Sequence, residues 1–278
     1  TCALPILRRA ADMAEILGED KKAKLFTEKA EAYSAAINKY GYSEEKRAYI
    51  DTVRDEYSYA HYLEFYKKKG RTPISYETYA RQVRVSVQTN TLAYLAGIIP
   101  KEKEADAMRF LVDNLDKGSF VAGTPARKTI GYPTEAEAPG GYVHIGSPFF
   151  LFFAYDAICK YGRHDLMLKS IRREWENMAA HGTNTCWEGF GSGKSWTRSI
   201  AHGWSASPAI YLQTEILGIK PLEAGFTKFT VVPHSDSTLT HAEGAVATPY
   251  GKISVKWEKH GDGYKIKVDA PAECEYVK

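Results

Sequence analysis

The chain has 278 residues, of which 44% are hydrophobic and 26% charged, so it can bury the core of one large domain or two smaller ones. Its formal net charge of +3 is small and its basic residues are dispersed, which argues against a nucleic-acid-binding surface. No apolar run reaches the ~18 residues that cross a bilayer, so no membrane span is predicted.

The N-terminal part is predicted to be a helical hairpin. A first helix is expected over residues 1–17, a break follows, and a second helix over residues 21–40 ends at Gly41, a common helix-terminating residue. The chain starts inside the first helical pattern, with neither an initiator methionine nor a signal sequence. We therefore expect a fragment of a longer protein or a processed precursor.

Further helices follow, and the intervening segments are less regular. Residues 49–66 are rich in aromatic side chains and fit no single element, and residues 118–146 form a loop rich in Gly and Pro. Apolar spacing predicts five more helices, at residues 75–97, 101–115, 147–161, 164–180 and 205–217.

Beyond Gly218 the apolar period changes from that of a helix to that of a strand. Alternating runs predict antiparallel strands at residues 226–232, 239–247, 252–258 and 264–268. Ile253, Val255 and Trp257 are expected to share one face. The predicted fold is thus mainly α with a C-terminal β domain, divided into residues 1–218 and residues 219–278.

Two segments, residues 182–189 and 201–208, gather one acid, one imidazole and two indoles between predicted helices. These side chains are Glu188, His202, Trp187 and Trp204. A carboxylate can activate water at an anomeric carbon, and indole faces can stack on a pyranose ring, so the set is typical of a sugar-cleaving pocket. Tryptophans near helix starts are also common core residues, and a Glu in a Gly-rich turn is commonly solvated. The residues alone leave both interpretations open.

The loop before residue 147 offers further polar side chains. Tyr142 and His144 lie at its end and are candidates for the same pocket, although a structural role is favoured for both. Glu135 and Glu137 stand beside prolines and are interpreted as solvated loop charges.

The four cysteines give no sign of a metal or redox site. Cys2, Cys159, Cys186 and Cys274 form no CxxC pair, and no His or Cys cluster has metal-ligand spacing. No cofactor and no metal are predicted, and the thiols are expected to be free.

Several segments together resemble the bacterial α-L-rhamnosidases of glycoside hydrolase family 78. They are QTNTLAYLAG at 88–97, IGSPFFL at 145–151, EWENMAAHGTNTCWE at 174–188, HGWSASPA at 202–209 and LGIKPLEAGF at 217–226. The resemblance is strongest from residue 88 to residue 258 and weak over the first 75 residues.

This resemblance implies an (α/α)6 barrel followed by a small antiparallel β-sandwich, and an inverting hydrolysis of terminal α-L-rhamnosides. Such a barrel has twelve helices, so the chain would hold only its later part. Glu188 matches the general base, and Trp187, His202 and Trp204 match positions that line the sugar pocket. The family's general acid lies in an acidic, Arg-containing motif upstream, which has no equivalent here. We therefore expect the chain alone to hydrolyse rhamnosides weakly or not at all.

Two alternatives remain: a non-catalytic carbohydrate-binding or scaffold module, and an (α/α)6 glycosidase for another sugar, since a fold alone does not select a substrate. The expected partner is a rhamnose-containing glycoside, oligosaccharide or polysaccharide. An opened barrel would expose apolar helix faces, so self-association is also expected. A periplasmic or extracellular bacterial location is favoured over the cytoplasm.

Overall fold

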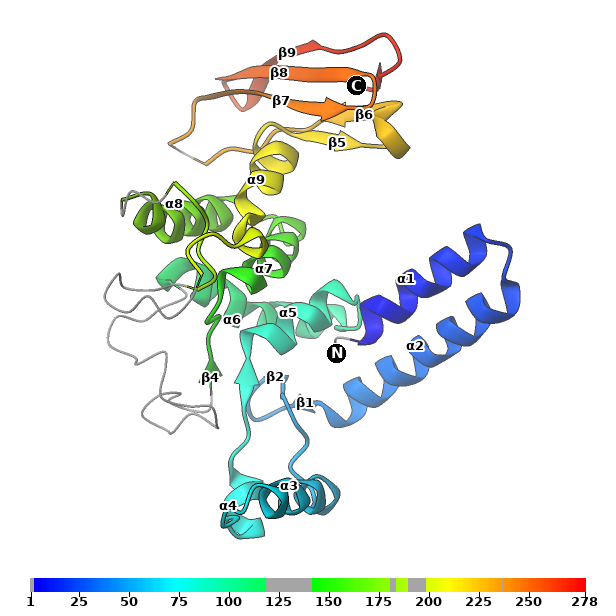
Figure 1. Ribbon diagram of the computed structural model, residues 1–278, viewed down its shortest axis with the longest axis vertical. Helices are drawn as coiled ribbons and strands as arrows, with labels where there is room; N and C mark the ends of the chain where they lie inside the picture. Colours follow the sequence, from blue (N-terminus) through cyan, green and yellow to red (C-terminus); the bar gives the residue numbers. More distant parts are fainter. Residues whose placement is uncertain (1–2, 119–141, 181–183, 190–198, 237) are drawn as a thin grey trace. The chain divides into compact units, whose positions relative to one another are not determined.

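The structure is a computed structural model that describes residues 3–118, 142–180, 184–189, 199–236 and 238–278. The chain divides into two compact units, Thr1–Gly146 and Ser147–Lys278. The first unit is mainly helical, and the second combines helices with the strands of the C-terminal part (Figure 1). The predicted combination of a helical part and a β domain is confirmed at this level.

The first unit begins with the predicted helical hairpin. Helices α1 (Ala3–Ile16) and α2 (Asp20–Tyr40) lie side by side (Figure 1), and Gly18 between them has a φ of +69°, which a glycine adopts without strain. The hairpin shares a core with the following elements, built from Leu4, Ala30, Tyr49, Ala93, Ala96, Ile98 and Ala107.

The segment that fitted no single element contains a strand and a helix. Strands β1 (Tyr42–Ser43) and β2 (Ala48–Tyr49) pair antiparallel, and α3 (Glu56–Lys68) begins after Asp55. The Asp55 carboxylate accepts a hydrogen bond from the backbone N–H of Ser58 at 2.8 Å. The Ser58 hydroxyl oxygen in turn accepts from the backbone N–H of Asp55, which completes a capping box.

The prediction of one helix over residues 75–97 is wrong. The structure has α4 (Tyr76–Arg81), β3 (Val85–Ser86) and α5 (Val87–Leu95) in its place. The cause is a long-range contact, because the Asp51 carboxylate accepts hydrogen bonds from the backbone N–H and the hydroxyl of Ser86. Ser86 is therefore extended and serves as the N-cap of α5, where its hydroxyl accepts from Thr89 N–H.

The remaining elements of this unit follow the prediction more closely. A short turn of 3₁₀-helix, η1 (Lys101–Lys103), leads into α6 (Glu104–Lys117), which packs against α5. Strand β4 (Tyr142–Val143) pairs in parallel with β3. Residues 119–141 of the predicted loop, with Glu135 and Glu137, lie outside the described residues.

The second unit starts with two helices that match their predictions within one residue at each end. They are α7 (Pro148–Lys160) and α8 (His164–Ala180), and α7 has Ser147 as its N-cap and proline in its first position. The predicted helix over residues 205–217 consists of three pieces: the 3₁₀ turn η3 (Gly203–Ser205), α9 (Ser207–Tyr211) and the π-helix η4 (Leu212–Ile216).

The described residues of the β domain form two three-stranded sheets. In one, β7 (His241–Thr248), β8 (Gly251–His260) and β9 (Gly263–Asp269) pair antiparallel in chain order. In the other, β6 (Lys228–Val231) lies between β5 (Ile219–Pro221) and β10 (Glu275–Tyr276), and the β6–β10 pair is parallel. Ile253, Val255 and Trp257 are buried on one face of β8, as predicted.

The helices of the described residues are each too short or too polar for a bilayer crossing.

Candidate functional site

Glu188 lies in the loop that follows α8, and backbone contacts fix its position. Its N–H donates to the carbonyl oxygen of Ser199 at 2.9 Å, and its carboxylate Oε2 accepts from the Ser199 N–H at 3.1 Å. The side chain is half-buried. The hydrogen bond to Oε2 orients the carboxylate, and its other oxygen, Oε1, can take a proton from water.

Trp204 places an aromatic face beside this loop. Its indole N–H donates to the Glu188 carbonyl oxygen at 3.1 Å, while the residue keeps 43% of its surface exposed. The centroid of the indole lies 4.0 Å from that of the His202 ring and 5.4 Å from that of the Phe149 ring. An exposed indole with an imidazole and a phenyl ring at its side is a surface on which a sugar ring can stack.

His202 has a polar atom that the described residues leave unsatisfied. Its backbone N–H donates to the Cys186 carbonyl oxygen at 2.8 Å, which joins the two segments of the site. Its ring Nδ1 is buried and has no hydrogen-bond partner among the described residues. A buried ring nitrogen without a partner is costly unless a ligand hydroxyl or a water satisfies it.

Trp187 is a buried anchor of the loop in the described structure. It is 3% exposed, its N–H lies 3.4 Å from the Met178 sulfur on α8, and its carbonyl oxygen accepts from the Ser205 hydroxyl. These contacts tie the Glu188 loop to α8 and η3. Its predicted role in lining the sugar pocket stays a prediction.

Tyr142 belongs to the first unit, where it has a packing partner of its own. It lies in β4, and its ring packs 4.9 Å from that of Phe110. Nearby, His144 Nδ1 lies 3.1 Å from the Asn114 amide nitrogen, and burial, with the charge of Lys117, lowers the pKa of His144. A substrate-binding role for Tyr142 stays a prediction.

Sequence reasoning missed Ser199 and Phe149 as neighbours of the site. Ser199 stands eleven residues from Glu188, and nothing in its type marks it as the partner of a carboxylate. The only sequence signal that could have pointed to Phe149 as a neighbour of the site is its position directly after the helix start at Ser147 and Pro148. The described residues also bring one group of metal-ligating atoms together, those of Cys159, His164 and Glu215, which no sequence spacing indicates.

Comparison with known proteins gives one consistent family. Residues 218–277 match the family described as the bacterial alpha-L-rhamnosidase C-terminal domain. An alpha-L-rhamnosidase of Alteromonas sp. (strain LOR) is 30% identical over 138 residues, which are 46% of this chain and 15% of that protein. An alpha-L-rhamnosidase of Formosa agariphila is 28% identical over 40% of this chain and 13% of that protein.

Solved structures extend the similarity over nearly the whole chain. The GH78 family rhamnosidase of Bacillus sp. GL1 is 31% identical with a TM-score of 0.70, and the alignment covers 98% of this chain and 25% of that one. The α-L-rhamnosidase of Dictyoglomus thermophilum, at 17% identity and a TM-score of 0.67 with the same coverage, shares the fold. This chain therefore spans about a quarter of the length of these solved structures.

Proposed function

We propose that the chain, which is similar to the α-L-rhamnosidases of glycoside hydrolase family 78, forms the C-terminal part of the catalytic region of such an enzyme. Residues 1–218 would belong to an (α/α)6 barrel and residues 219–278 to a β-sandwich domain. This division is supported by the family match that starts at residue 218 and by the first strand of the β domain, which starts at Ile219.

In this proposal Glu188 is the general base of an inverting hydrolysis. It takes a proton from a water molecule, and the oxygen of that water attacks the anomeric carbon while the glycosidic bond breaks. The observation that supports the assignment is the hydrogen bond from the partly exposed Trp204 indole to the Glu188 backbone carbonyl oxygen, in a loop where the Ser199 N–H donates to the Glu188 carboxylate. Trp204 and His202 would hold the rhamnose ring.

An inverting hydrolysis also needs a carboxylic acid about 6.5–9.5 Å from the base, which protonates the departing oxygen. We propose that this acid comes from a segment outside the 278 residues. The chain alone would then hydrolyse rhamnosides weakly or not at all, because loss of one acid or base typically costs about 100- to 10,000-fold in rate. Exposed apolar side chains such as Phe152 and Ile210 fit the further proposal that the isolated chain self-associates.

The test measures release of 4-nitrophenol from 4-nitrophenyl α-L-rhamnopyranoside. It uses the 278-residue chain and a longer protein that carries it behind the upstream barrel segments. We expect activity in the longer protein and a fall of about 100- to 10,000-fold in kcat in its Glu188→Gln variant. Glu243→Gln is the matched control, since this glutamate lies on β7 with 70% of its side chain exposed.

The outcomes separate the alternatives. Full activity of Glu188→Gln would overturn the assignment of the base. A longer protein that is inactive on the rhamnoside but cleaves a glucoside or uronide would support a glycosidase for another sugar. A longer protein that binds rhamnose without cleaving any of these substrates would support the binding-module alternative.

A further inference from the structure

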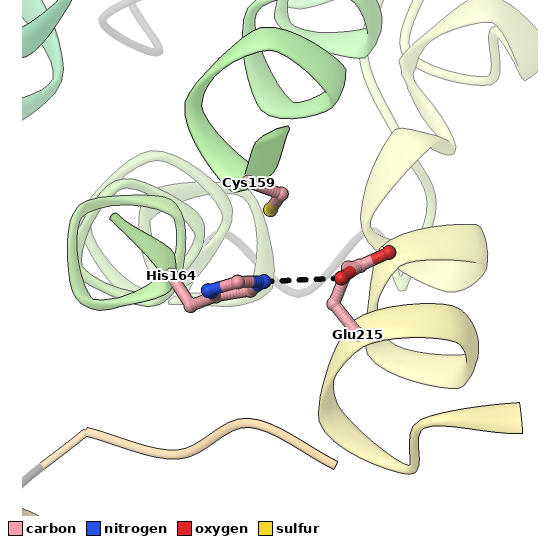
Figure 2. Close-up of side chains that lie close together, drawn as sticks. All are labelled: Cys159, His164 and Glu215. Atoms are coloured by element: carbon pink, nitrogen blue, oxygen red, sulfur yellow. Dashed lines mark hydrogen bonds and ion pairs between the residues drawn. The ribbon is translucent and has the colours of Figure 1, made fainter. Parts of the chain in front are cut away.

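Three potential metal ligands of different chemical types meet in the second unit. Sγ of Cys159, a ring nitrogen of His164 and a carboxylate oxygen of Glu215 all lie within 4.8 Å of one another. Figure 2 shows the three side chains pointing toward a common point from separate segments of the chain. Cys159 and His164 are five residues apart, but Glu215 lies 51 residues beyond His164, so no local spacing pattern indicates the complete group.

The local backbone explains how they come together. Cys159 lies in the last turn of α7 and His164 in the first turn of α8, and Gly162, with a φ of +84°, makes the turn between these helices. Glu215 comes from the π-helix η4, in which the N–H of Leu217 donates to the carbonyl oxygen of Leu212 five residues earlier. Such π turns are rare and frequently occur at functional sites.

The donors are also well shielded and already in contact. His164 Nε2 lies 3.1 Å from Glu215 Oε2, and their side chains are only 13% and 12% exposed. Cys159 is half-buried, and its sulfur lies 3.5 Å from that of Met167. Zinc binds thiolate sulfur at about 2.3 Å and imidazole nitrogen or carboxylate oxygen at about 2.0–2.2 Å, so a small inward movement of these atoms would complete three bonds.

We propose that Cys159, His164 and Glu215 bind a thiophilic divalent metal ion of the zinc class, with water as a fourth ligand. A sulfur, nitrogen and oxygen donor set suits this class better than it suits magnesium or calcium, which prefer all-oxygen ligands. On binding, the ion replaces the thiol proton, which leaves to solvent, and forms a bond to the resulting thiolate. The ion would join the α7–α8 hairpin to the π-helix that leads into the β domain.

His234 packs against the site and is not expected to be a fourth ligand. Its ring stacks on that of His164, with the centroids 3.6 Å apart and the planes 5° from parallel. A metal ion lies in the plane of an imidazole that binds it, so two parallel stacked rings cannot both bind one ion well. His234 Nδ1 also faces the backbone oxygen of Glu215 at 3.3 Å, which fixes the ring against His164.

Lys220 is the group that competes with the ion. Its ammonium donates to Glu215 Oε2 at 2.8 Å. Without metal, Lys220 and Glu215 neutralise each other. With a divalent ion, the thiolate and the carboxylate already balance its charge, and the ammonium becomes a surplus positive charge close to it. Removing the Lys220 charge should therefore strengthen metal binding, whereas removing a ligand should weaken it.

The test uses Co²⁺ as a spectroscopic substitute for Zn²⁺, with the 278-residue chain freed of metal by a chelator. A thiolate ligand gives a near-ultraviolet charge-transfer band, and tetrahedral Co²⁺ gives strong visible bands. We expect one equivalent of Co²⁺ to produce both, and Zn²⁺ to remove both. Cys159→Ser should lose the charge-transfer band, and Cys274→Ser should keep it, since Cys274 is a buried thiol of the β domain beside Thr248.

Affinities for Zn²⁺ measured by competition with a chromophoric chelator complete the test. We expect Cys159→Ser to weaken binding by about 100-fold or more and Lys220→Met to tighten it by about tenfold or more. His164→Gln is a second ligand variant, for use if circular dichroism shows that Cys159→Ser is unfolded. Absence of the charge-transfer band in the unchanged chain, or its persistence in Cys159→Ser, would overturn the proposal, and an unchanged affinity in Lys220→Met would overturn the competition for Glu215.

Discussion

The indole N–H of Trp204 donates a 3.1 Å hydrogen bond to the backbone carbonyl oxygen of Glu188. One residue thus serves two purposes, because the hydrogen bond fixes the backbone that carries the carboxylate while the exposed ring remains available to a ligand. The two contributions can be separated by substitution, since phenylalanine keeps an aromatic ring without the N–H and alanine keeps neither.

The first prediction concerns Trp204 in a longer protein that carries the upstream barrel segments. Trp204→Phe should lower kcat by about 2- to 10-fold, the effect of one lost hydrogen bond. Trp204→Ala should in addition raise KM about tenfold, because the apolar face that buries the sugar ring is gone. Steady-state kinetics on 4-nitrophenyl α-L-rhamnopyranoside measure both. Tyr250→Ala, at an exposed aromatic in the β domain, is the control and should change neither.

Equal kinetics for the phenylalanine and alanine variants would contradict the stacking role of the Trp204 ring. Unchanged kcat in both would contradict its positioning of Glu188.

The second prediction concerns the stereochemistry of the product. If Glu188 activates water on the face of the sugar opposite the departing group, the first product from an α-L-rhamnoside is β-L-rhamnose. Proton NMR of the anomeric signals during the first minutes of the reaction distinguishes the two anomers before they interconvert. Early appearance of the α-anomer would assign Glu188 to a retaining mechanism and contradict its role as a base.

The third prediction concerns acid stability and Asp236. Burial alone would raise the pKa of this carboxyl, but hydrogen bonds from Arg172 and Thr238 hold the pKa at about 2, below the ordinary value of 3.8. A depressed carboxyl pKa stabilises the fold above pH 3.8, and this contribution is lost as the pH falls toward 2. Asp236→Asn should lower the free energy of unfolding by about 2 kcal/mol at pH 7. At pH 3 the loss should be smaller, about 1 kcal/mol.

Urea unfolding of both proteins at pH 7, 5 and 3 measures this difference. Thr238→Val is a useful companion variant, because it removes the side-chain hydroxyl that donates to Asp236 at 2.8 Å and leaves the pair with Arg172 in place. It should show a smaller loss with the same sign of pH dependence. A difference between the unchanged chain and Asp236→Asn that does not depend on pH would contradict the prediction.

Local signals predicted the elements whose ends are set by neighbouring residues. Ser147 and Pro148 mark the start of α7, and alternating residues mark the buried face of β8. The prediction of one helix over residues 75–97 was wrong because Asp51 interrupts the continuous helical pattern. Its carboxylate accepts a hydrogen bond from Ser86, 35 residues later in the chain. No window of sequence contains that contact, so periodicity alone could not reveal the break.

The site shows the same division between local and distant information. Glu188 and Trp204 stood out by residue type, and the structure joins them through one hydrogen bond. The burial of Trp187 could not be predicted from its residue type, since indoles occur both in cores and at sugar-binding surfaces. The meeting of Cys159 with Glu215 depends on a π turn, and sequence propensities for π turns are too weak to predict one.

The fourth prediction concerns Gly218, where the helical part of the second unit meets β5. Its φ is +80°, and a Cβ added there would lie 2.3 Å from the backbone carbon of Val232, so neither the conformation nor the space allows a side chain. The Gly218 carbonyl oxygen also accepts from Val232 N–H at 2.9 Å, which holds the two strands' ends together. Gly218→Ala should cost about 3 kcal/mol or more, the sum of left-handed strain and displaced backbone.

Gly261→Ala separates the two causes, because Gly261 has a φ of +59° but nothing within 4 Å of an added Cβ. It should cost only the strain of the left-handed conformation, about 1–2 kcal/mol. Both variants are compared with the unchanged chain by urea unfolding, followed by tryptophan fluorescence, since the indole N–H of buried Trp257 donates to the Ile216 carbonyl oxygen, two residues before Gly218. Equal losses in the two variants would mean that the strands move apart at Val232 without cost and that conformation alone requires glycine at position 218.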